Sequence, residues 1–431
     1  MSPSAHPINS AFSFSLEHSA GVVRFEEARR LVELHAAGVR AGGLETVELL
    51  ASLGRVLAEE IVADRDFPPF DRAARDGYAV RAGDLAELPA RLEIVGEVKA
   101  GDWPEPGTCM VKGGQAVGIM TGAPLPAGAD AVVMVEHTSG NDETAGKAAP
   151  NAVDVRRGVS RGENFVPRGS EARAGQVLLD GGRRMDHAGI GIAAAVGKSR
   201  VQVFQKPRVA VLSTGDEVVE IDAAPGAAQI RNSNSYSLAA QVQNAGGEAV
   251  RLAVAPDEPR RLRALIEEGM ECDLLLLAGG VSMGKYDLVK QALGELKAEF
   301  YFTGAEIQPG RPVVFGACDK KYFFGLPGNP VSTMVTFELF ARPMIEALAG
   351  MKPQPMIFLR ARLKTEIRTK TGLKRFRPAV LSGEFENAEV ELAGWQGSGD
   401  IAALAGANCY VVIPPERERI EAGEWVSLLL R

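Results

Sequence analysis

The amino-acid sequence predicts an α/β plus all-β fold, with a doubly wound α/β domain, an inserted β domain and a C-terminal β-barrel-like domain. Three observations carry this prediction. The chain has 431 residues, enough for about two to four domains. Strands alternate with helices over residues 206–350. Short β runs separated by turn clusters fill residues 56–165 and 351–431.

Each predicted domain takes its bounds from a change in residue pattern. Residues 1–20 are rich in Ser, Pro and Ala and are expected to be a disordered tail. Residues 21–55 and 166–205 form a helical/linker domain, with a helix from Phe25 whose apolar residues share one face. A second helix is expected in the run LGRVLAEEIV, which starts at Leu53. The strands of the β domain are expected in LEIVGEV, TCMVKG, AVGIM and DAVVMVE, with a hairpin tip at residues 137–151.

Residues 206–350 show the pattern of a parallel sheet covered by helices. The run DLLLLAGG has no period-two alternation, which indicates a strand buried on both faces. RVAVLST and EAVRLAV are further strands. Helices are expected to begin near Ser235, Asp257 and Tyr286, with an earlier one near Asp186. The C-terminal strands are expected in IFLRARL, KRFRPAVL, CYVVIP and EWVSLLL.

Composition and charge argue against several classes of protein. A net charge of −7 argues against a dedicated nucleic-acid binder and means that an anionic ligand needs a local positive site. The four cysteines lie far apart without CxxC spacing, so neither a zinc site nor a disulfide framework is expected. Such widely spaced cysteines fit the reduced thiols of a cytoplasmic protein, which is what we expect. The sequence has no apolar run near the ~20 residues of a membrane span, and its N-terminus lacks the pattern of a signal peptide.

Ligands of an open parallel sheet bind beyond the carboxyl ends of its strands. Three segments follow such strand ends here: Gly215-Asp216-Glu217, residues 281–287, and LPGNPVS from Leu326 to Ser332. The usual dinucleotide and Walker A motifs do not occur in the sequence. We therefore expect these segments to meet in one crevice that holds its ligand in another way.

The glycine-rich turn after DLLLLAGG offers groups for an anion and a metal. Gly279 and Gly280 let the backbone approach a ligand closely. Ser282 supplies a hydroxyl and Lys285 a charge. Asp287 could ligate a metal, or it could simply stabilise the start of the next helix.

Two further carboxylates have more than one interpretation. Glu217, expected to be buried after a strand and a glycine, is either a functional or a structural residue. Asp257 is favoured as the N-cap of a helix that has Pro259 in its first turn.

The stretch LPGNPVS predicts a rigid turn from a strand into a helix. Asn329 is a good N-cap and Pro330 a good first residue, while Pro327 fixes φ just before them. The amides of residues 331–333 should then be free to bind an anion. Arg311, in the second stiff corner QPGRP, adds a guanidinium suited to oxyanions. The alternative is a well-capped structural helix without a ligand.

Six ordered motifs carry a resemblance to a known family. They are FDRAARDGYAV, GIMTGAPLPAGADAVVMVE, VLSTGDEV, LLLAGGVSMGKYD, QPGRPVVFG and GLPGNPVSTMVTFELF. By composition alone the first two are merely turns. Together the six closely resemble the MoeA family of molybdopterin molybdenumtransferases, to which the E domain of gephyrin also belongs. The resemblance runs from about Phe25 to the C-terminus.

The resemblance implies an elongated homodimer of four-domain chains with a MogA-like α/β domain. Members of the family insert molybdate into adenylylated molybdopterin, with Mg²⁺-dependent release of AMP. The implied cleft lies between the α/β domain of one subunit and the β domain of the other. Contact with other molybdenum cofactor biosynthesis proteins is a further expectation, and neither nucleic acid nor a membrane is an expected partner.

Matching the motifs residue by residue implies the functional positions. The implied catalytic residues are Asp71, Thr121, Glu171, Glu217, Asp257 and Asp287, and the last three are the expected Mg²⁺ ligands. With the positions argued above, the expected substrate-binding residues are Gly279, Gly280, Ser282, Lys285, Arg311, Pro327, Gly328, Asn329, Pro330, Ser332, Arg375 and Ser398.

Two segments depart from the family pattern. Gln308 stands where the family commonly has lysine, which removes one positive charge from the expected anion corner. Ala73-Ala74-Arg75 replaces the familiar Ser-Ala-Met, so that Arg72 or Arg75 is a candidate to restore the charge. The alternative functions are a catalytically divergent dimeric scaffold, a cofactor carrier, or an insertase for tungstate, whose size and charge almost equal those of molybdate.

Overall fold

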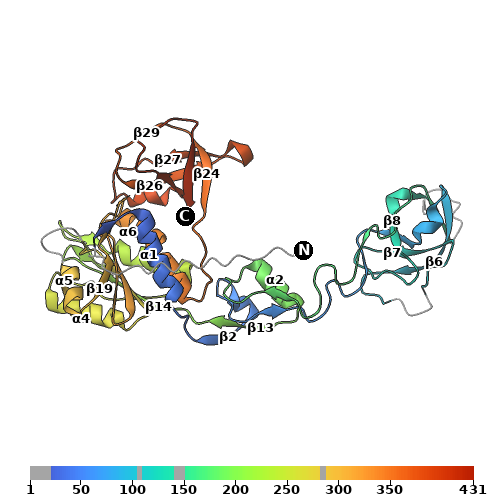
Figure 1. Ribbon diagram of the computed structural model, residues 1–431, viewed down its shortest axis with the longest axis horizontal. Coiled ribbons are helices and arrows are strands. Elements are labelled where there is room, and N and C mark those ends of the chain that lie inside the picture. The colour runs from blue at the N-terminus through green and yellow to red at the C-terminus, as the bar shows by residue number, and fades with distance from the viewer. Residues whose placement is uncertain (1–20, 104–108, 140–150, 282–287) are drawn as a thin grey trace, which may run out of the picture.

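The computed structural model describes residues 21–103, 109–139, 151–281 and 288–431. The chain is elongated (Figure 1), with the α/β domain and the C-terminal β domain at one end and the inserted β domain at the other. Between them runs the linker region, which we define as residues 44–62 and 177–204. The expected N-terminal tail and most of the expected hairpin tip lie outside the described residues.

The α/β domain is built on a six-stranded sheet in which four neighbouring strands are parallel, and two further strands at one side of the sheet are added in antiparallel pairings. The central strand contains four consecutive leucines that are all fully buried, as the sequence predicted for a strand covered on both faces. In order across the sheet, the strands are β17 (Glu248–Arg251), β14 (Arg208–Ser213), β18 (Leu274–Ala278), β23 (Lys321–Leu326), β22 (Val314–Cys318) and β19 (Glu299–Phe302).

Helices cover both faces of this sheet, which confirms the doubly wound prediction. One face carries α1 (Phe25–Gly38), α3 (Ser233–Ala245), α6 (Pro330–Thr336) and α7 (Arg342–Leu348), and the other carries α4 (Pro259–Met270) and α5 (Leu288–Glu295). Helix α4 buries Leu262, Ile266 and Gly269, which share one face. The predicted domain bounds stay a prediction, although α1 packs on this domain through contacts such as Phe25 with Phe340.

The helix that follows LPGNPVS is irregular. Helix α6 leads into a π-helical segment, Phe337–Ala341, and α7 follows with Pro343 in its first turn. A proline ring clashes with the preceding turn of a helix, which favours a break or kink at this residue. The π segment absorbs that change of geometry just ahead of the proline.

The inserted β domain contains a six-stranded sheet. The prediction of a strand in TCMVKG is wrong for its described residues, 109–113, which form no strand. The Val111 amide donates to the Ala127 carbonyl of a loop instead of to a neighbouring strand. In order across the sheet, the strands are β8 (Ala131–Met134), β5 (Gly77–Val80), β7 (Gln115–Ile119), β6 (Ala90–Val98), β10 (Ala152–Val155) and β9 (Thr138–Ser139).

The linker region contains two small antiparallel pairs, one α-helix and a short 3-10 helix, Leu49–Ser52. The helix predicted from Leu53 is wrong: Val56 and Leu57 form bridges to Arg184 and Val203 and bury their side chains between the strands. The helix expected near Asp186 is present, since this carboxylate accepts the Gly189 amide at 2.8 Å as an N-cap. The pairs are β2 (Leu44–Glu48) with β13 (Arg200–Phe204) and β3 (Ile61–Val62) with β12 (Val177–Leu179), and the helix is α2 (His187–Ala195).

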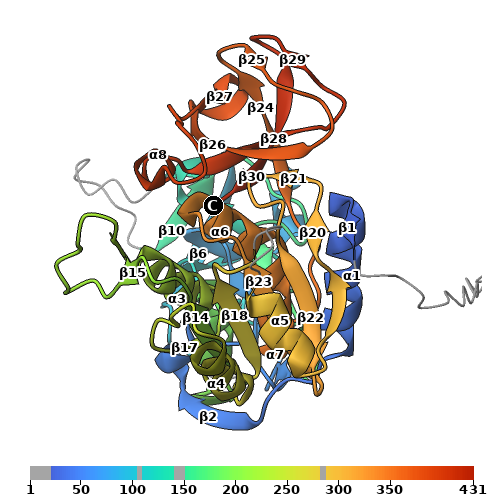
Figure 2. The same ribbon diagram turned by 90° about the vertical axis from the view of Figure 1, so that its left-hand side faces the viewer.

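The C-terminal domain is a closed five-stranded barrel, in the upper part of Figure 2. The barrel closes because β26 pairs with both β27 and β28. Strand β21 (Ile307–Gln308) of the preceding domain pairs in parallel with β26, which places Gln308 beside Arg375. The barrel strands are β26 (Lys374–Ser382), β27 (Glu389–Leu392), β24 (Phe358–Leu363), β30 (Trp425–Leu430) and β28 (Cys409–Ile413).

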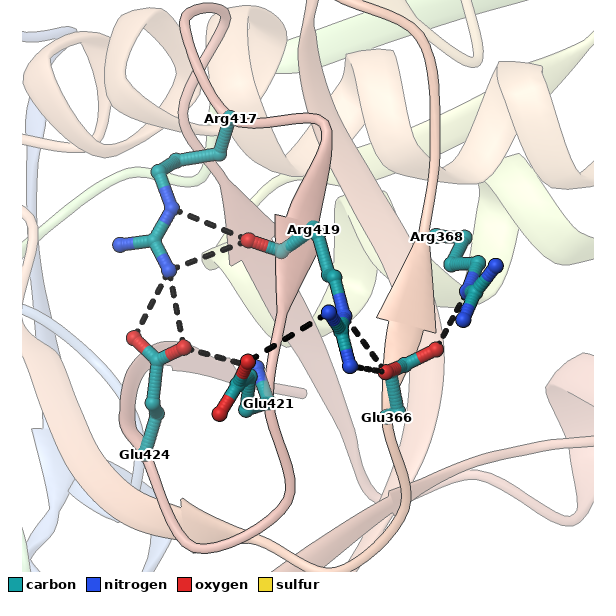
Figure 3. A network of polar contacts seen from close by, with 6 residues as sticks. All are labelled: Glu366, Arg368, Arg417, Arg419, Glu421 and Glu424. Carbon is teal, nitrogen blue, oxygen red and sulfur yellow. Dashed lines mark hydrogen bonds and ion pairs between the residues drawn. The ribbon is translucent and has the colours of Figure 1, made fainter.

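A surface network on this barrel neutralises Arg368, Arg417 and Arg419 (Figure 3). Glu366 accepts from both Arg368 and Arg419, and Glu424 accepts two bonds from Arg417 at 2.7 and 3.0 Å. The side-chain hydrogen bonds from Arg368 and Arg419 hold the pKa of Glu366 below its usual value. Every arginine of this network has a carboxylate partner.

None of the helices described here is long and apolar enough to span a membrane.

Helix α1 is fixed to the edge of the α/β sheet through His35. Its ring stacks on Tyr301 with centroids 3.9 Å apart, and its Nδ1 lies 3.3 Å from the Tyr322 hydroxyl. Burial lowers the pKa of His35, against an opposing effect of nearby Glu299. The folded protein therefore binds a proton at His35 less readily than the unfolded chain.

We predict that His35 destabilises the fold as the pH falls. Because the pKa is lowered by folding, stability is lost as the pH drops below the unfolded value of about 6.5. In the variant His35→Gln this loss should disappear, so that the melting temperature of the wild type should fall relative to the variant between pH 7.5 and pH 5. A melting-temperature difference that does not change with pH would contradict the prediction.

Candidate functional site

A cavity of about 780 Å³ lies beyond the carboxyl ends of the parallel strands. It is lined by Glu217 after β14, by Gly279 and Gly280 after β18, and by the segment 327–330 after β23. The sequence predicted that the segments after these three strands share one edge of the sheet, and the structure brings their described residues together, while residues 282–287 lie outside the described part of the chain. We call this cavity the crevice.

Acidic side chains gather on one side of the crevice. Asp257 and Glu217 both line it, and the Asp257 amide donates to Asp216 Oδ1 at 3.0 Å. Burial, and then the charges of Asp216 and Glu217, raise the pKa of Asp257. Negative charge is therefore concentrated here, at a place where a cation would relieve the repulsion.

Two expectations about these carboxylates are wrong. Asp257 does not cap helix α4, because Glu258 occupies the N-cap position and makes no side-chain cap bond. Glu217 is exposed instead of buried, since the chain turns outward at Gly215. Gly215 has a φ of 129°, and a Cβ there would collide with the Glu217 carboxylate. Both acids are therefore free to face a ligand.

Among the residues that the structure describes, no group of three or more His, Cys, Asp or Glu side chains is arranged to hold a metal ion. The third expected ligand, Asp287, lies outside the described residues, as do Ser282 and Lys285. Mg²⁺ typically takes one or two carboxylates together with substrate phosphates and water. The pair Glu217 and Asp257 fits that requirement.

The floor of the crevice is made of glycines and a buried hydroxyl. Gly279 and Gly280 have φ values of 99° and 67°, and a Cβ on either would lie within 3.0 Å of Thr214 Oγ1. Only glycine can follow this path. The Thr214 hydroxyl itself is buried and has no hydrogen-bond partner in the described structure. It is a polar group available to a ligand.

Sequence reasoning missed two asparagines that line the crevice. Asn232 accepts from the Ser213 hydroxyl at 2.9 Å and caps α3, while its Nδ2 is buried without a partner among described atoms. Asn234 donates to the Gly328 carbonyl at 2.8 Å, and this bond ties α3 to the PGNP turn. The polar run NSNS at residues 232–235, which forms the N-cap and first turn of α3, was the sequence signal for these groups.

The amides of residues 331–333, at the start of α6, were expected to be free to bind an anion. For Val331 and Thr333 this expectation is wrong, because both amides already have an acceptor within the protein. The Val331 amide donates to the Ser398 carbonyl at 3.0 Å, and the Thr333 amide donates to the Asn329 carbonyl. Asn329 stands at the N-cap position, yet its side chain donates to Ser398 Oγ at 2.8 Å and makes no cap bond. The rigid PGNP turn therefore joins the α/β domain to the C-terminal barrel, and its amides are largely used.

A second cavity of about 690 Å³ continues from the crevice and shares Pro312, Pro327 and Asn329 with it. Arg311, Ser332 and Ser398 line this second cavity. A third, of about 530 Å³, adjoins it through Arg377 and Trp395 and is also lined by Arg375. We call the second and third cavities the trough.

The trough concentrates positive charge that has no acidic partner. Arg375 is 5% exposed, and its Nε donates to Gln308 Oε1 at 2.7 Å. Burial lowers the pKa of both Arg375 and Arg377, and for Arg377 the charge of Arg375 adds to this effect. Within the described part of the chain, neither arginine forms an ion pair, in contrast to the network of Figure 3.

Arg377 and Trp395 are the second group that sequence reasoning missed. The guanidinium of Arg377 stacks on the indole of Trp395, 4.4 Å from the ring centroid. Arg377 Nε and Trp395 Nε1 are buried donors without a described partner. The sequence KRFRPAV could have revealed Arg377, because residues two apart in a strand lie on the same face. Arg375 and Arg377 are therefore on one face of β26. Gln308 accepts from Arg375 where a lysine would repel it.

A separate group of predicted residues lies in the inserted β domain. Arg72 pairs with Glu171 at 3.0 Å, and Asp71 Oδ1 accepts the Arg168 amide at 2.8 Å. Thr121 lies near these residues. The amide of Gly122, which follows Thr121, donates to the carbonyl of Ala73, which follows Arg72. The structure thus brings Asp71, Thr121 and Glu171 together from distant segments. We call this group the β-domain cluster.

Within one chain, the β-domain cluster does not meet the crevice, because the two domains stand at opposite ends of the molecule (Figure 1). Arg72 and Arg75, the candidates to restore a charge near Gln308, also lie in the β domain. Arg72 is paired with Glu171, whereas Arg75 is exposed. Neither arginine adds positive charge to the trough of its own chain.

Three family models cover most of the chain. The MoeA N-terminal region (domain I and II) matches residues 23–197, a probable molybdopterin binding domain matches residues 210–347, and the MoeA C-terminal region (domain IV) matches residues 360–430.

Curated relatives and solved structures agree with these matches. The chain is 34% identical to the molybdopterin molybdenumtransferase of Nostoc sp. over 89% of this chain and 88% of that one, and 34% identical to that of Bacillus subtilis over 91% and 90%. A crystal structure of a molybdopterin biosynthesis MoeA protein from Pyrococcus horikoshii aligns with a TM-score of 0.70 at 33% identity, over 95% of this chain and 99% of that one. These matches show that the chain belongs to the MoeA family.

Proposed function

We propose that the protein is a molybdopterin molybdenumtransferase of molybdenum cofactor biosynthesis, which inserts molybdate into adenylylated molybdopterin and releases AMP. The single observation that carries this proposal is the crevice opening into the trough. It joins an acidic side suited to a cation and phosphates to a basic side suited to an oxyanion. The names of the relatives support the same assignment.

Glu217 and Asp257 are the proposed ligands of Mg²⁺, together with Asp287. Bound there, Mg²⁺ would neutralise phosphate charge while the phosphoanhydride of the substrate is cleaved. The chain's own contribution is to hold these carboxylates near each other, through the bond from the Asp257 amide to Asp216. The glycine floor at Gly279 and Gly280 lets the substrate's phosphates lie against the backbone, where Thr214 and Asn232 offer unused polar groups.

The trough is the proposed molybdate site. Arg311 and Ser398 line its part next to the crevice, while Arg375 and Arg377 add buried positive charge further along. A tetrahedral dianion would supply the counter-charge that these arginines lack and would accept from Arg377 Nε and Trp395 Nε1. Since molybdenum is bound by the pterin's sulfurs, the protein needs no cysteine ligand.

The proposed assembly is a cytoplasmic homodimer in which the β-domain cluster of one protomer closes the crevice of the other. The elongated shape supports this, since the inserted β domain stands at the other end of the molecule from the α/β domain that holds the crevice (Figure 1). Each protomer would then supply half of two equivalent sites. A scaffold would need neither the acids nor the buried arginines, so these residues favour an enzyme.

We predict that the purified protein releases AMP from adenylylated molybdopterin only when Mg²⁺ and molybdate are present, and that it then reconstitutes an apo-molybdoenzyme. The variant Asp257→Asn should need about 10- to 100-fold more Mg²⁺ for half-maximal AMP release, because one anionic ligand is lost. Asp222 is exposed and does not line the crevice, so Asp222→Asn is the control and should behave as the wild type. AMP release without reconstitution would point to a divergent paralogue, and no AMP release would point to a scaffold or carrier.

We predict that Arg377→Gln weakens molybdate binding about 10- to 100-fold, as expected for loss of a charge-assisted hydrogen bond of about 1.5–3 kcal/mol. Arg362→Gln is a matched control, because Arg362 also lies over a tryptophan of the barrel, 5.2 Å from the Trp425 centroid, but away from the trough. Calorimetric titration with molybdate, repeated with tungstate, measures both. Equal affinities in the two variants would refute the proposed site.

A further inference from the structure

Two aromatic side chains form an exposed ledge beside the β-domain cluster. Phe70 and Trp103 meet edge to face, with ring centroids 5.8 Å apart and planes at 71°. Trp103 is 67% exposed, although a ring of this size usually hides most of its surface. An edge-to-face pair leaves a face of each ring uncovered, and we call this pair the aromatic ledge.

The aromatic ledge lies next to the predicted catalytic residues of the β domain. Phe70 directly precedes Asp71 in the chain. The turn that leads to Trp103 approaches the Thr121 segment, because a Cβ built on Gly122 would lie 3.7 Å from the Cβ of Ala100. Met120, 41% exposed, adds apolar surface at the same place. Apolar ring faces and carboxylates therefore share one exposed edge of the domain.

We propose that the aromatic ledge stacks on the flat heteroaromatic ring of the substrate, the pterin or the adenine of adenylylated molybdopterin, presented in the crevice of the partner protomer. This inference rests on the proposed function and names a binding role for Phe70 and Trp103.

The chemistry around the ledge fits a charged ring compound. Stacking on an aromatic side chain suits any planar base. Asp71 uses one carboxylate oxygen for the Arg168 amide and is exposed, so it can accept from a ring amino group. Arg75 is exposed on the same segment and can face a phosphate.

The size of the ledge argues against a protein as its occupant. A stable protein interface buries about 800 Å² on each partner, around a core of several apolar residues. Two rings and one methionine offer far less, whereas they match the area of one bicyclic heterocycle. The ledge therefore fits a small-molecule ring better than a flat protein surface.

The test compares Trp103→Leu with Trp425→Leu, in which a second exposed tryptophan is removed from the C-terminal barrel. Trp103→Leu should raise the KM for adenylylated molybdopterin about tenfold, as expected from the loss of one stacked base. Trp103→Phe should restore most of this loss, and Trp425→Leu should keep the wild-type KM. In a protein with Trp395 and Trp425 replaced by Phe, AMP or free pterin should quench the fluorescence of Trp103.

The outcomes separate the ledge from the proposed function. If the wild type turns over, while Trp103→Leu keeps its KM and neither AMP nor pterin quenches Trp103, the ledge proposal is wrong and the function stands. If the wild type releases no AMP, the proposed function fails, and the quenching titration alone decides whether the ledge binds a ring. If Trp103→Leu instead dissociates the dimer in sedimentation experiments, the ledge is a contact between protomers and the proposal is overturned.

Discussion

Within one chain, the crevice and the β-domain cluster lie in domains at opposite ends of the molecule (Figure 1). The proposal of an active site shared between two protomers depends on this separation. The linker region does not behave as a loose tether. Strands β2 and β13 pair along five residues each, and Arg184 donates to the carbonyls of Gly54 and Ala245, which ties the linker to the end of α3. Linker contacts of this kind hold the β domain of a chain away from its own crevice. A second copy of the chain is therefore the proposed source of the Asp71 that would meet Glu217, with two shared sites in a dimer.

Charge without a partner marks the proposed ligand positions. In the surface network of the barrel, Arg368, Arg417 and Arg419 are each paired with a glutamate (Figure 3). Arg375 and Arg377 lie close together on the same barrel, without a carboxylate in the described structure, and burial lowers the pKa of each. Asp257 instead lies beside the negative charges of Asp216 and Glu217, which together with burial raise its pKa. A cation on one side and an oxyanion on the other would satisfy both at once, and the shared wall at Pro327 and Asn329 keeps them adjacent.

The sequence predicted the parts of the protein that follow from local pattern. The run of four leucines without polar alternation predicted the central strand β18. The segments that follow the parallel strands predicted where the crevice would lie. Predictions failed where a tertiary partner decided the outcome. The run from Leu53 looks helical, but bridges to Arg184 and Val203 draw it into a sheet. Asn329 looks like a helix cap, but Ser398 of the barrel takes its side chain. Arg377 was overlooked, because only the closed barrel shows that it stacks on Trp395 beside Arg375.

Complementation between two inactive variants tests the shared site most directly. Asp71→Asn removes a carboxylate of the β-domain cluster, and Glu217→Gln removes one from the crevice. When the two variants are co-expressed, each mixed dimer has one site with both changes and one site with neither. If the two groups share a site, each variant alone is nearly inactive and random mixing restores roughly a quarter of wild-type AMP release. If the mixture is as inactive as the separate variants, the two groups do not meet across the dimer and the proposed shared site is wrong.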